Sequence, residues 1–166
     1  MTGFTSISPQ DDARGFRDAL GQYGTGVCVI TTRTSENQIV GMTANSFASV
    51  SLDPPLVLWS PAKSSRRFEA FSEAPHYAIH VLGTAHTHVA ADFVREANAF
   101  SGLSFGVNAH GVPLLEDCIA RFECDTDVIH DAGDHAIIVG RVTNVAMGAG
   151  APLMFQGGRY GDFAAH

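Results

Sequence analysis

Residues 41–68 place short hydroxyl and amide side chains around two apolar runs, ahead of a cluster of cations. Thr43, Asn45, Ser46 and Ser49 supply hydrogen-bond donors and acceptors in and after the first run. The amide of Asn45 both donates and accepts, which suits the edge of a heterocycle that carries both kinds of group. This half of the segment therefore indicates a site for a polar ligand that contains a ring.

The second half of the segment joins cations and hydroxyls where a helix is predicted to begin. Lys63, Ser64, Ser65 and Arg66 follow one another there. Free N–H groups at a helix start, together with hydroxyls and positive charges, favour a phosphate group. Serine and asparagine are also ordinary cap and turn residues, so either half alone has a structural explanation. Both halves together, separated by one strand, favour a ligand that carries a phosphate.

Other sequence patterns that would indicate a reaction are missing. The phosphate-loop pattern G-x-x-x-x-G-K-[ST] does not occur, and the Gly-Thr-Gly of residues 24–26 precedes a predicted strand rather than a helix. The serines do not lie in a G-x-S-x-G nucleophile motif. Residues 41–68 are therefore the main indication of function.

The eight histidines show no spacing typical of a zinc site, so the sequence predicts no metal. His86 and His88 are two residues apart on a predicted helix and therefore point to different faces. We expect His76, His86, His88 and His166 to be surface histidines. His135 follows a Gly-Asp pair at the start of a predicted strand, where capping a turn is its simplest role.

The composition is that of a single globular domain. The 166 residues are 45% hydrophobic and carry a net charge of -7, which disfavours nucleic acid as a partner. The three cysteines lack a C-x-x-C pattern, and we expect them to be reduced and buried. No apolar run approaches the ~20 residues of a membrane span, and no signal peptide is recognisable. We therefore expect a cytoplasmic protein that binds no membrane.

The hydrophobic pattern predicts a mainly β fold with a few short helices. Strands and helices do not alternate, which favours a barrel of about six antiparallel strands over a doubly wound sheet. A flexible arm, residues 1–10, is expected to precede one domain, residues 11–166. We predict helices at 13–23, 64–74 and 87–100, a loop at 101–118, and strands at 27–32, 39–52, 56–60, 77–82, 120–128, 135–148 and within 152–163.

Four segments, taken in order, resemble the short-chain flavin reductase family, whose members serve two-component flavin-dependent monooxygenases. The resemblance runs from about Phe16 to Phe163, nearly the whole chain. It implies an FMN-binding split barrel, flavin reductase-like, that forms a homodimer with the flavin in a groove near the dimer interface. The segments are the early helix into YGTGVCVITT, GMTANSFASVSLDPPLVLWSPAKSS, the Gly-Asp-His of AGDHAIIVGRV, and the closing PLMFQGGRYGDF.

The resemblance also implies roles for individual residues. His135 is the expected catalytic residue, which positions the nicotinamide, and His80 stands where the family often has asparagine. The flavin ring and ribityl chain would contact Thr43, Ala44, Asn45, Ser46 and Ser49; the phosphate would lie near Lys63, Ser64, Ser65 and Arg66; Phe93, Arg95, Phe100 and Ser101 would close the cofactor pocket; His135, Arg159 and Tyr160 would face the nicotinamide nucleotide.

The implied activity is hydride transfer from NADH or NADPH to FMN or FAD, after which the reduced flavin leaves for a partner monooxygenase. A site rich in Ser, Thr and Asn suits this activity, because hydride transfer needs no strongly placed acid or base. FMN is favoured over FAD. NADH is favoured because Arg159 has no arginine beside it for a 2′-phosphate. Two alternatives remain open: a flavoprotein that retains FMN as a prosthetic group, and a non-enzymatic split-barrel domain that binds or senses flavin.

Overall fold

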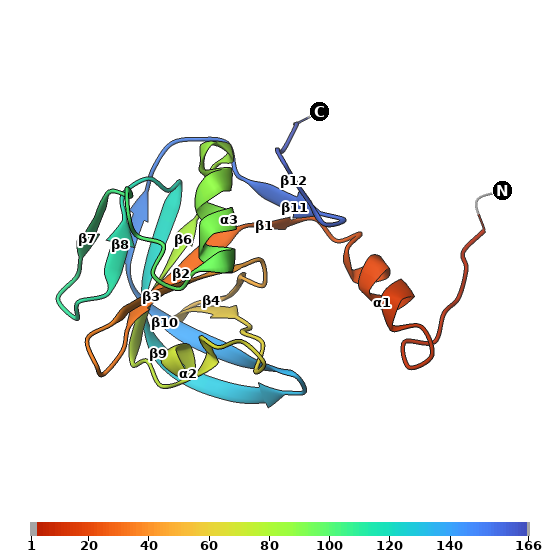
Figure 1. Cartoon of the computed structure of the whole chain (residues 1–166), viewed down its shortest axis with the longest axis horizontal. Helices are drawn as coiled ribbons and strands as arrows, with labels where there is room; N and C mark the ends of the chain where they lie inside the picture. Colours follow the sequence, from red (N-terminus) through yellow and green to blue (C-terminus); the bar gives the residue numbers. More distant parts are fainter. Residues whose placement is uncertain (1–2, 166) are drawn as a thin grey trace.

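The structure is a computed structural model that describes residues 3–165. Strands dominate, and the helices are short (Figure 1). In chain order the elements are α1 (Ala13–Leu20), β1 (Thr25–Gly26), β2 (Cys28–Arg33), β3 (Ile39–Ala44), β4 (Ala48–Leu52), β5 (Pro55–Trp59), α2 (Phe68–Ser72), β6 (His76–Val81), the 3-10 turn η1 (Thr84–His86), α3 (Thr87–Arg95), β7 (Phe105–Val107), β8 (Pro113–Leu115), β9 (Ala120–Ala132), β10 (His135–Met147), β11 (Met154–Gln156) and β12 (Arg159–Gly161).

The main sheet has seven strands in the order β3-β2-β6-β9-β10-β5-β4, and neighbouring strands are antiparallel. The consecutive strands β3 and β4 form its two edges, so the sheet is left open between them. Side chains from both halves of the sheet nevertheless meet in one core that includes Ile30, Trp59, Tyr77, Cys124 and Ile138. The fold is therefore a split barrel, and the prediction of a mainly β barrel is confirmed.

Large aromatic side chains fill the barrel core. The Trp59 ring meets Phe71 of α2 edge-on, with centroids 5.1 Å apart. Gly140 is required here, because a Cβ at that position would lie 2.0 Å from the Tyr77 hydroxyl. Burial raises the pKa of the Cys28 and Cys124 thiols to about 12, which keeps both protonated. Both are free and buried as predicted, whereas Cys118 is free but only half-buried.

A second core lies on the other face of the sheet, under α3 and the hairpin β7–β8. Val29, Leu82, Phe93, Phe100 and Leu115 are among its buried members. The helix packs close to β3 because Gly41 has no side chain; a Cβ there would lie 2.3 Å from the Phe93 ring.

His80 is fully buried between these layers and has both ring nitrogens bonded. Its Nε2 accepts from the Leu115 N–H at 3.1 Å, so Nδ1 carries the proton and donates to the Val29 carbonyl at 3.0 Å. Burial lowers the pKa of His80 to about 4, and the ring is neutral in the folded protein at neutral pH. It connects β2, β6 and β8.

Several predicted segments need correction. The strand predicted at 39–52 is two strands, β3 and β4, and the helix predicted at 13–23 ends at Leu20. Residues 101–118 contain the hairpin β7–β8 instead of a loop; its strands are only three residues long and include Gly106 and Pro113, so the sequence shows no strand pattern there. The helix predicted at 64–74 is confined to α2, and the helix predicted at 87–100 ends at Arg95. The strand β9 extends to Ala132, which leaves a two-residue turn before β10.

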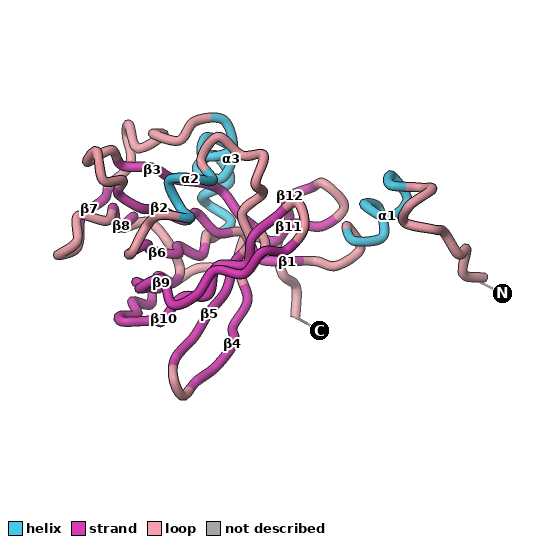
Figure 2. Tube along the Cα trace, turned by 90° about the horizontal axis from the view of Figure 1, so that it is seen from below, coloured by secondary structure: helices cyan, strands magenta, loops and turns pink. Residues whose placement is uncertain are grey.

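The helix α1 projects from the barrel (Figures 1 and 2). Two hydrogen bonds tie its end to the β11–β12 turn, from Gly157 N–H to the Gly21 carbonyl and from the Gln156 amide to the Gln22 carbonyl, both at 2.9 Å. Within residues 3–165, none of the helices is long and apolar enough to cross a membrane. Residues 1–2 of the predicted arm and His166 lie outside the described residues.

Candidate functional site

Three segments that are distant in the sequence meet at one end of the barrel. The Ser46 hydroxyl accepts from the Ser60 N–H at 2.9 Å and donates to the Ser60 carbonyl at 3.3 Å, which joins the β3–β4 loop to the end of β5. Ala62 then forms an antiparallel bridge with His135, the first residue of β10. The structure therefore brings residues 43–49, residues 60–66 and His135 together, although they are distant in the sequence.

Lys63 fastens the turn between β9 and β10. Its backbone N–H donates to the Asp134 carbonyl at 2.9 Å, and its ammonium donates to the Asp131 carboxylate and, at 2.6 Å, to the Gly133 carbonyl. The ammonium lowers the pKa of Asp131. The Lys63 side chain remains 38% exposed, so its charge is available to a ligand while it holds the turn.

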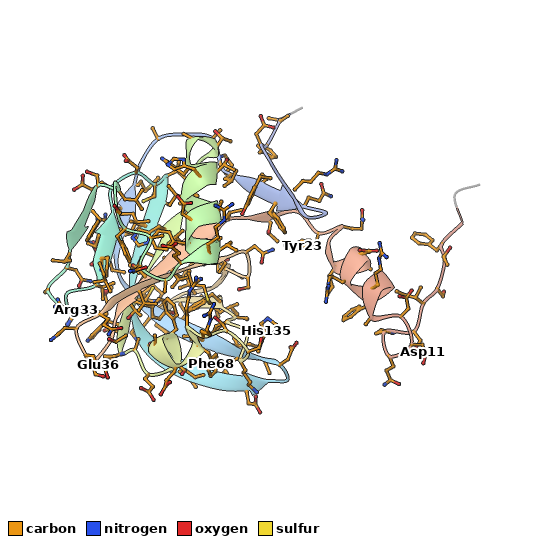
Figure 3. The ribbon with its side chains drawn as sticks, viewed as in Figure 1. Asp11, Tyr23, Arg33, Glu36, Phe68 and His135 are labelled. Carbon is orange, nitrogen blue, oxygen red and sulfur yellow. The ribbon has the colours of Figure 1, made fainter. Side chains whose placement is uncertain are left out.

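His135 stands at the end of this fastened turn (Figure 3). Its Nδ1 lies 2.7 Å from Oδ1 of the adjacent Asp134 carboxylate, and the hydrogen bond with the imidazole lowers the pKa of Asp134. With the Nδ1 proton donated to Asp134, Nε2 is left as an acceptor. The His135 side chain is 44% exposed, so it can reach a bound molecule.

Several polar side chains in these segments have no protein partner. Within residues 3–165, Asn45, Ser49, Ser64 and Arg66 are exposed and their side chains make no hydrogen bond. Uncommitted amide, hydroxyl and guanidinium groups on one rim are the donor and acceptor set that a flavin and its phosphate require. The residues present therefore fit a flavin.

The side chains of other predicted flavin contacts are bonded to or packed against the rest of the protein. The Thr43 hydroxyl donates to the Ala90 carbonyl of α3 at 2.7 Å, and Ala44 packs against the barrel core. Ser65 accepts from the Arg67 N–H at 3.2 Å and contacts the Met42 sulfur. These residues shape the rim, and a ligand would reach their backbone groups and remaining lone pairs.

The predicted contribution of α3 needs correction. The rings of Phe93 and Phe100 are buried in the second core, with centroids 5.0 Å apart, so they support the site from below instead of lining it. Arg95 and Ser101 are exposed beside them. Sequence reasoning missed Arg67, whose guanidinium donates to the Phe93 and Val94 carbonyls at 2.6 and 3.2 Å. Partial burial lowers the pKa of Arg67, and this side chain anchors residues 63–67 to the end of α3.

Arg159 and Tyr160 lie on β12, in the small sheet β1-β11-β12. The Tyr160 ring packs on Phe155 with centroids 5.5 Å apart. Among the described residues, no hydrogen bond joins Arg159 or Tyr160 to His135. His135 lies on β10 of the seven-stranded sheet, so the residues predicted to face the nicotinamide come from two separate sheets.

A cavity of about 530 Å³ opens on the other side of Arg66, between α2 and the β2–β3 turn. Arg33, Glu69 and Glu73 also line it. No sequence pattern indicates this cavity, because its walls come from the surface of a helix and a hairpin turn.

Comparison with known proteins agrees with this geometry. Residues 20–164 match the model of the flavin reductase like domain family. The FMN reductase (NADH) SmoA of Agrobacterium fabrum is 55% identical over 154 residues, which cover 93% of this chain and 88% of that protein. The flavin-dependent monooxygenase reductase subunit HsaB of Mycobacterium tuberculosis is 36% identical over 158 residues, with 93% and 84% covered.

A solved structure shows the same arrangement of the chain. The NADH:FAD oxidoreductase SgcE6 of Streptomyces globisporus superimposes with a TM-score of 0.90 at 32% identity, over 100% of this chain and 95% of that one. The chain belongs to the flavin reductase-like domain family, a class of split-barrel oxidoreductases. It is a flavin reductase, as the four sequence segments indicated.

Proposed function

We propose that the chain transfers a hydride from NADH to FMN or FAD and releases the reduced flavin to a separate monooxygenase. One observation carries this proposal: the uncommitted polar rim of residues 45–66 and the His135 turn are joined by the Ala62–His135 bridge. A flavin site and a nicotinamide site must be adjacent for hydride transfer. The relatives named as an NADH-dependent FMN reductase and as a monooxygenase reductase subunit support the same pairing.

Different residues of the rim would bind different parts of the flavin and the nicotinamide. Asn45 would pair with the edge of the flavin ring, and Ser64 and Arg66 with the phosphate. His135 would hold the nicotinamide amide through Nε2, on a turn that Lys63 keeps in place. When bound, the flavin supplies the acceptor for the nicotinamide hydride. The protein contributes orientation and exclusion of water, which account for much of the rate in such reactions.

The choice between cofactors is part of the proposal. FMN is favoured over FAD because the cationic residues 63–66 can meet a single terminal phosphate. NADH is favoured over NADPH because Arg159, on an exposed hairpin, has no second arginine next to it for a 2′-phosphate. The names of the relatives that include FMN and NADH support both choices.

We also propose that two copies form the active unit. An exposed apolar stripe on α1 and the turn after it comprises Phe16, Leu20 and Tyr23, whose exposed fractions are 44%, 60% and 79%. No part of the same chain covers this stripe within the described residues. A second copy would bury the stripe and could bring its own β11–β12 hairpin toward His135, which completes the nicotinamide site.

Steady-state oxidation of NADH and NADPH, each with FMN, FAD and riboflavin, tests the proposed function. We expect NADH oxidation that depends on added flavin, fastest with FMN, by protein that purifies without colour. Protein that stays yellow through dialysis would instead identify a flavoprotein that retains FMN. Flavin binding without oxidation of either nucleotide would identify a non-enzymatic flavin-binding or sensor domain.

A further inference from the structure

A second group of reactive side chains shares no residue with the flavin rim. His76 begins β6, Asp125 lies on β9, and His110 lies in the turn between β7 and β8. The nearest ligand atoms of the three side chains all lie within 4.8 Å of one another. Gly111, next to His110, packs against the Arg33 side chain, and Figure 3 places Arg33 on the opposite side of the barrel from His135.

Two of the three ligands are fixed by the sheet. His76 and Asp125 are direct partners in the register of β6 and β9, and their Nδ1 and Oδ1 atoms lie 2.7 Å apart. The His76 carbonyl accepts from the buried Thr32 hydroxyl at 2.7 Å, which fixes the backbone that carries the ring. A cross-strand pair on a continuous sheet holds its donor atoms at a constant separation.

The third ligand is fixed by the side chain of Asn108. Its oxygen accepts from the His110 and Val112 N–H groups at 3.0 and 3.1 Å, and its nitrogen donates to Glu123 of β9 at 2.9 Å. The turn is thus tied to the barrel, and the His110 ring stacks on the His76 ring with centroids 3.6 Å apart and planes 16° apart.

This arrangement is expected to bind a cation. A neutral imidazole offers one nitrogen lone pair to a cation. Two imidazoles and a carboxylate are the donor set that Zn²⁺ and related ions prefer, with water in the remaining positions. All three side chains are partly or fully exposed, so an ion can reach them.

We infer that His76, His110 and Asp125 form a binding site for one divalent transition-metal ion of the Zn²⁺ type. The ion takes one donor atom from each of three elements, and it therefore ties the β7–β8 hairpin to the barrel. The inference does not depend on the proposed flavin chemistry, because the cluster shares no residue with the flavin rim. No sequence pattern indicates the site, since His110 follows His76 by 34 positions and lies in a segment predicted to be a loop.

Isothermal titration of tag-free, full-length protein stripped with EDTA tests the inference directly. Zn²⁺ should bind with one ion per chain at micromolar affinity, and should raise the midpoint of thermal unfolding. Co²⁺ should give visible absorption from nitrogen and oxygen ligands. His110→Ala and Asp125→Asn should each weaken binding at least about tenfold, because each removes one of three ligands.

His88→Ala provides the matched control, since His88 is an exposed histidine on α3 outside the cluster. That variant should bind Zn²⁺ as the wild type does, and circular dichroism should show all variants folded. The inference is overturned if the wild type shows no binding at one ion per chain. It is also overturned if His110→Ala binds Zn²⁺ with wild-type affinity, or if the loss occurs in His88→Ala instead.

Discussion

His135 is the single side chain on which the rate of flavin reduction should depend most. We predict that His135→Ala slows flavin reduction by NADH roughly tenfold or more, which corresponds to an increase of ~1.4 kcal/mol in the activation free energy. The reason is that its Nε2 is the acceptor left free on a turn fastened by Lys63. Rapid mixing of preformed protein–flavin complex with NADH measures the rate.

His130→Ala is the matched control, because His130 is an exposed histidine on the same hairpin. Its reduction rate should equal that of the wild type. Flavin affinity should be unchanged in both variants. If His135→Ala loses flavin affinity by enough to explain its slower rate, His135 belongs to the flavin site, and Arg159 and Tyr160 remain as candidates for the nucleotide.

His80 makes the stability of the fold sensitive to acid. Its pKa is about 4 in the folded protein against an ordinary 6.5, so unfolding takes up a proton between these values. The contribution of neutral His80 to the free energy of unfolding is complete above pH 6.5 and is lost as the pH falls toward 4. Arg121 and Glu123 face the ring from β9 and act in opposite directions, so burial decides the shift.

The acid sensitivity can be measured by urea unfolding. Between pH 7.5 and 5.0 the wild type should lose about 2 kcal/mol through His80 alone. His80→Asn cannot take up this proton, but it leaves the Leu115 N–H without its acceptor. It should therefore be less stable at pH 7.5 and should lose less on acidification. An equal loss in both proteins would show that other groups cause the acid sensitivity.

At the scale of elements, the segment between β5 and α2 is the proposed phosphate site, so a substitution there should affect binding of the flavin phosphate and not of the flavin ring. Arg66 is its exposed cation without a protein hydrogen bond in the described part of the chain, whereas Lys63 and Arg67 are committed to the β9–β10 turn and to α3. We predict that Arg66→Ala weakens FMN binding about tenfold, the loss of one exposed charge-assisted contact. Quenching of flavin fluorescence measures the affinity.

Riboflavin is the internal control for this variant, because it has the ring and lacks the phosphate. Its affinity should not change in Arg66→Ala. Equal losses for FMN and riboflavin would contradict a phosphate site at residues 63–66, and would point to a disturbed rim instead. Circular dichroism should show the variant folded.

The local sequence pattern predicts which segments are strands or helices, but it does not predict which segments contact one another. The run before Arg33 and the long run after His135 were predicted as strands, because β-branched residues and alternation are local signals. The burial of Phe93 and Phe100, the role of Arg67 and the β7–β8 hairpin depend on partners far along the chain. No single-sequence pattern contains those partners, and the same reason hid the cluster around His110.

At the scale of the whole molecule, the projecting helix α1 argues for a dimer. We predict a light-scattering mass of twice the 17.6 kDa of one chain at micromolar concentration. Leu20→Asp should shift the protein toward the monomer, because it places a charge in the exposed apolar stripe. It should also lower the reductase activity if a second copy completes the nicotinamide site.

Asp18→Asn is the matched control, since Asp18 lies on the opposite face of the same short helix. It should keep both the dimer and the activity. A wild-type protein that is monomeric at micromolar concentration would remove the proposal of a two-copy active unit.

Because few contacts attach α1 to the barrel, the rate of proteolysis of this helix should depend on the protein concentration. Arg14 and Arg17 lie on a helix whose end is tied to the β11–β12 turn by two hydrogen bonds. In a dimer the partner shields this helix, while in dilute solution the helix can fray and be cut. Trypsin should therefore remove the first residues faster at nanomolar than at micromolar protein, and the remaining barrel should stay intact.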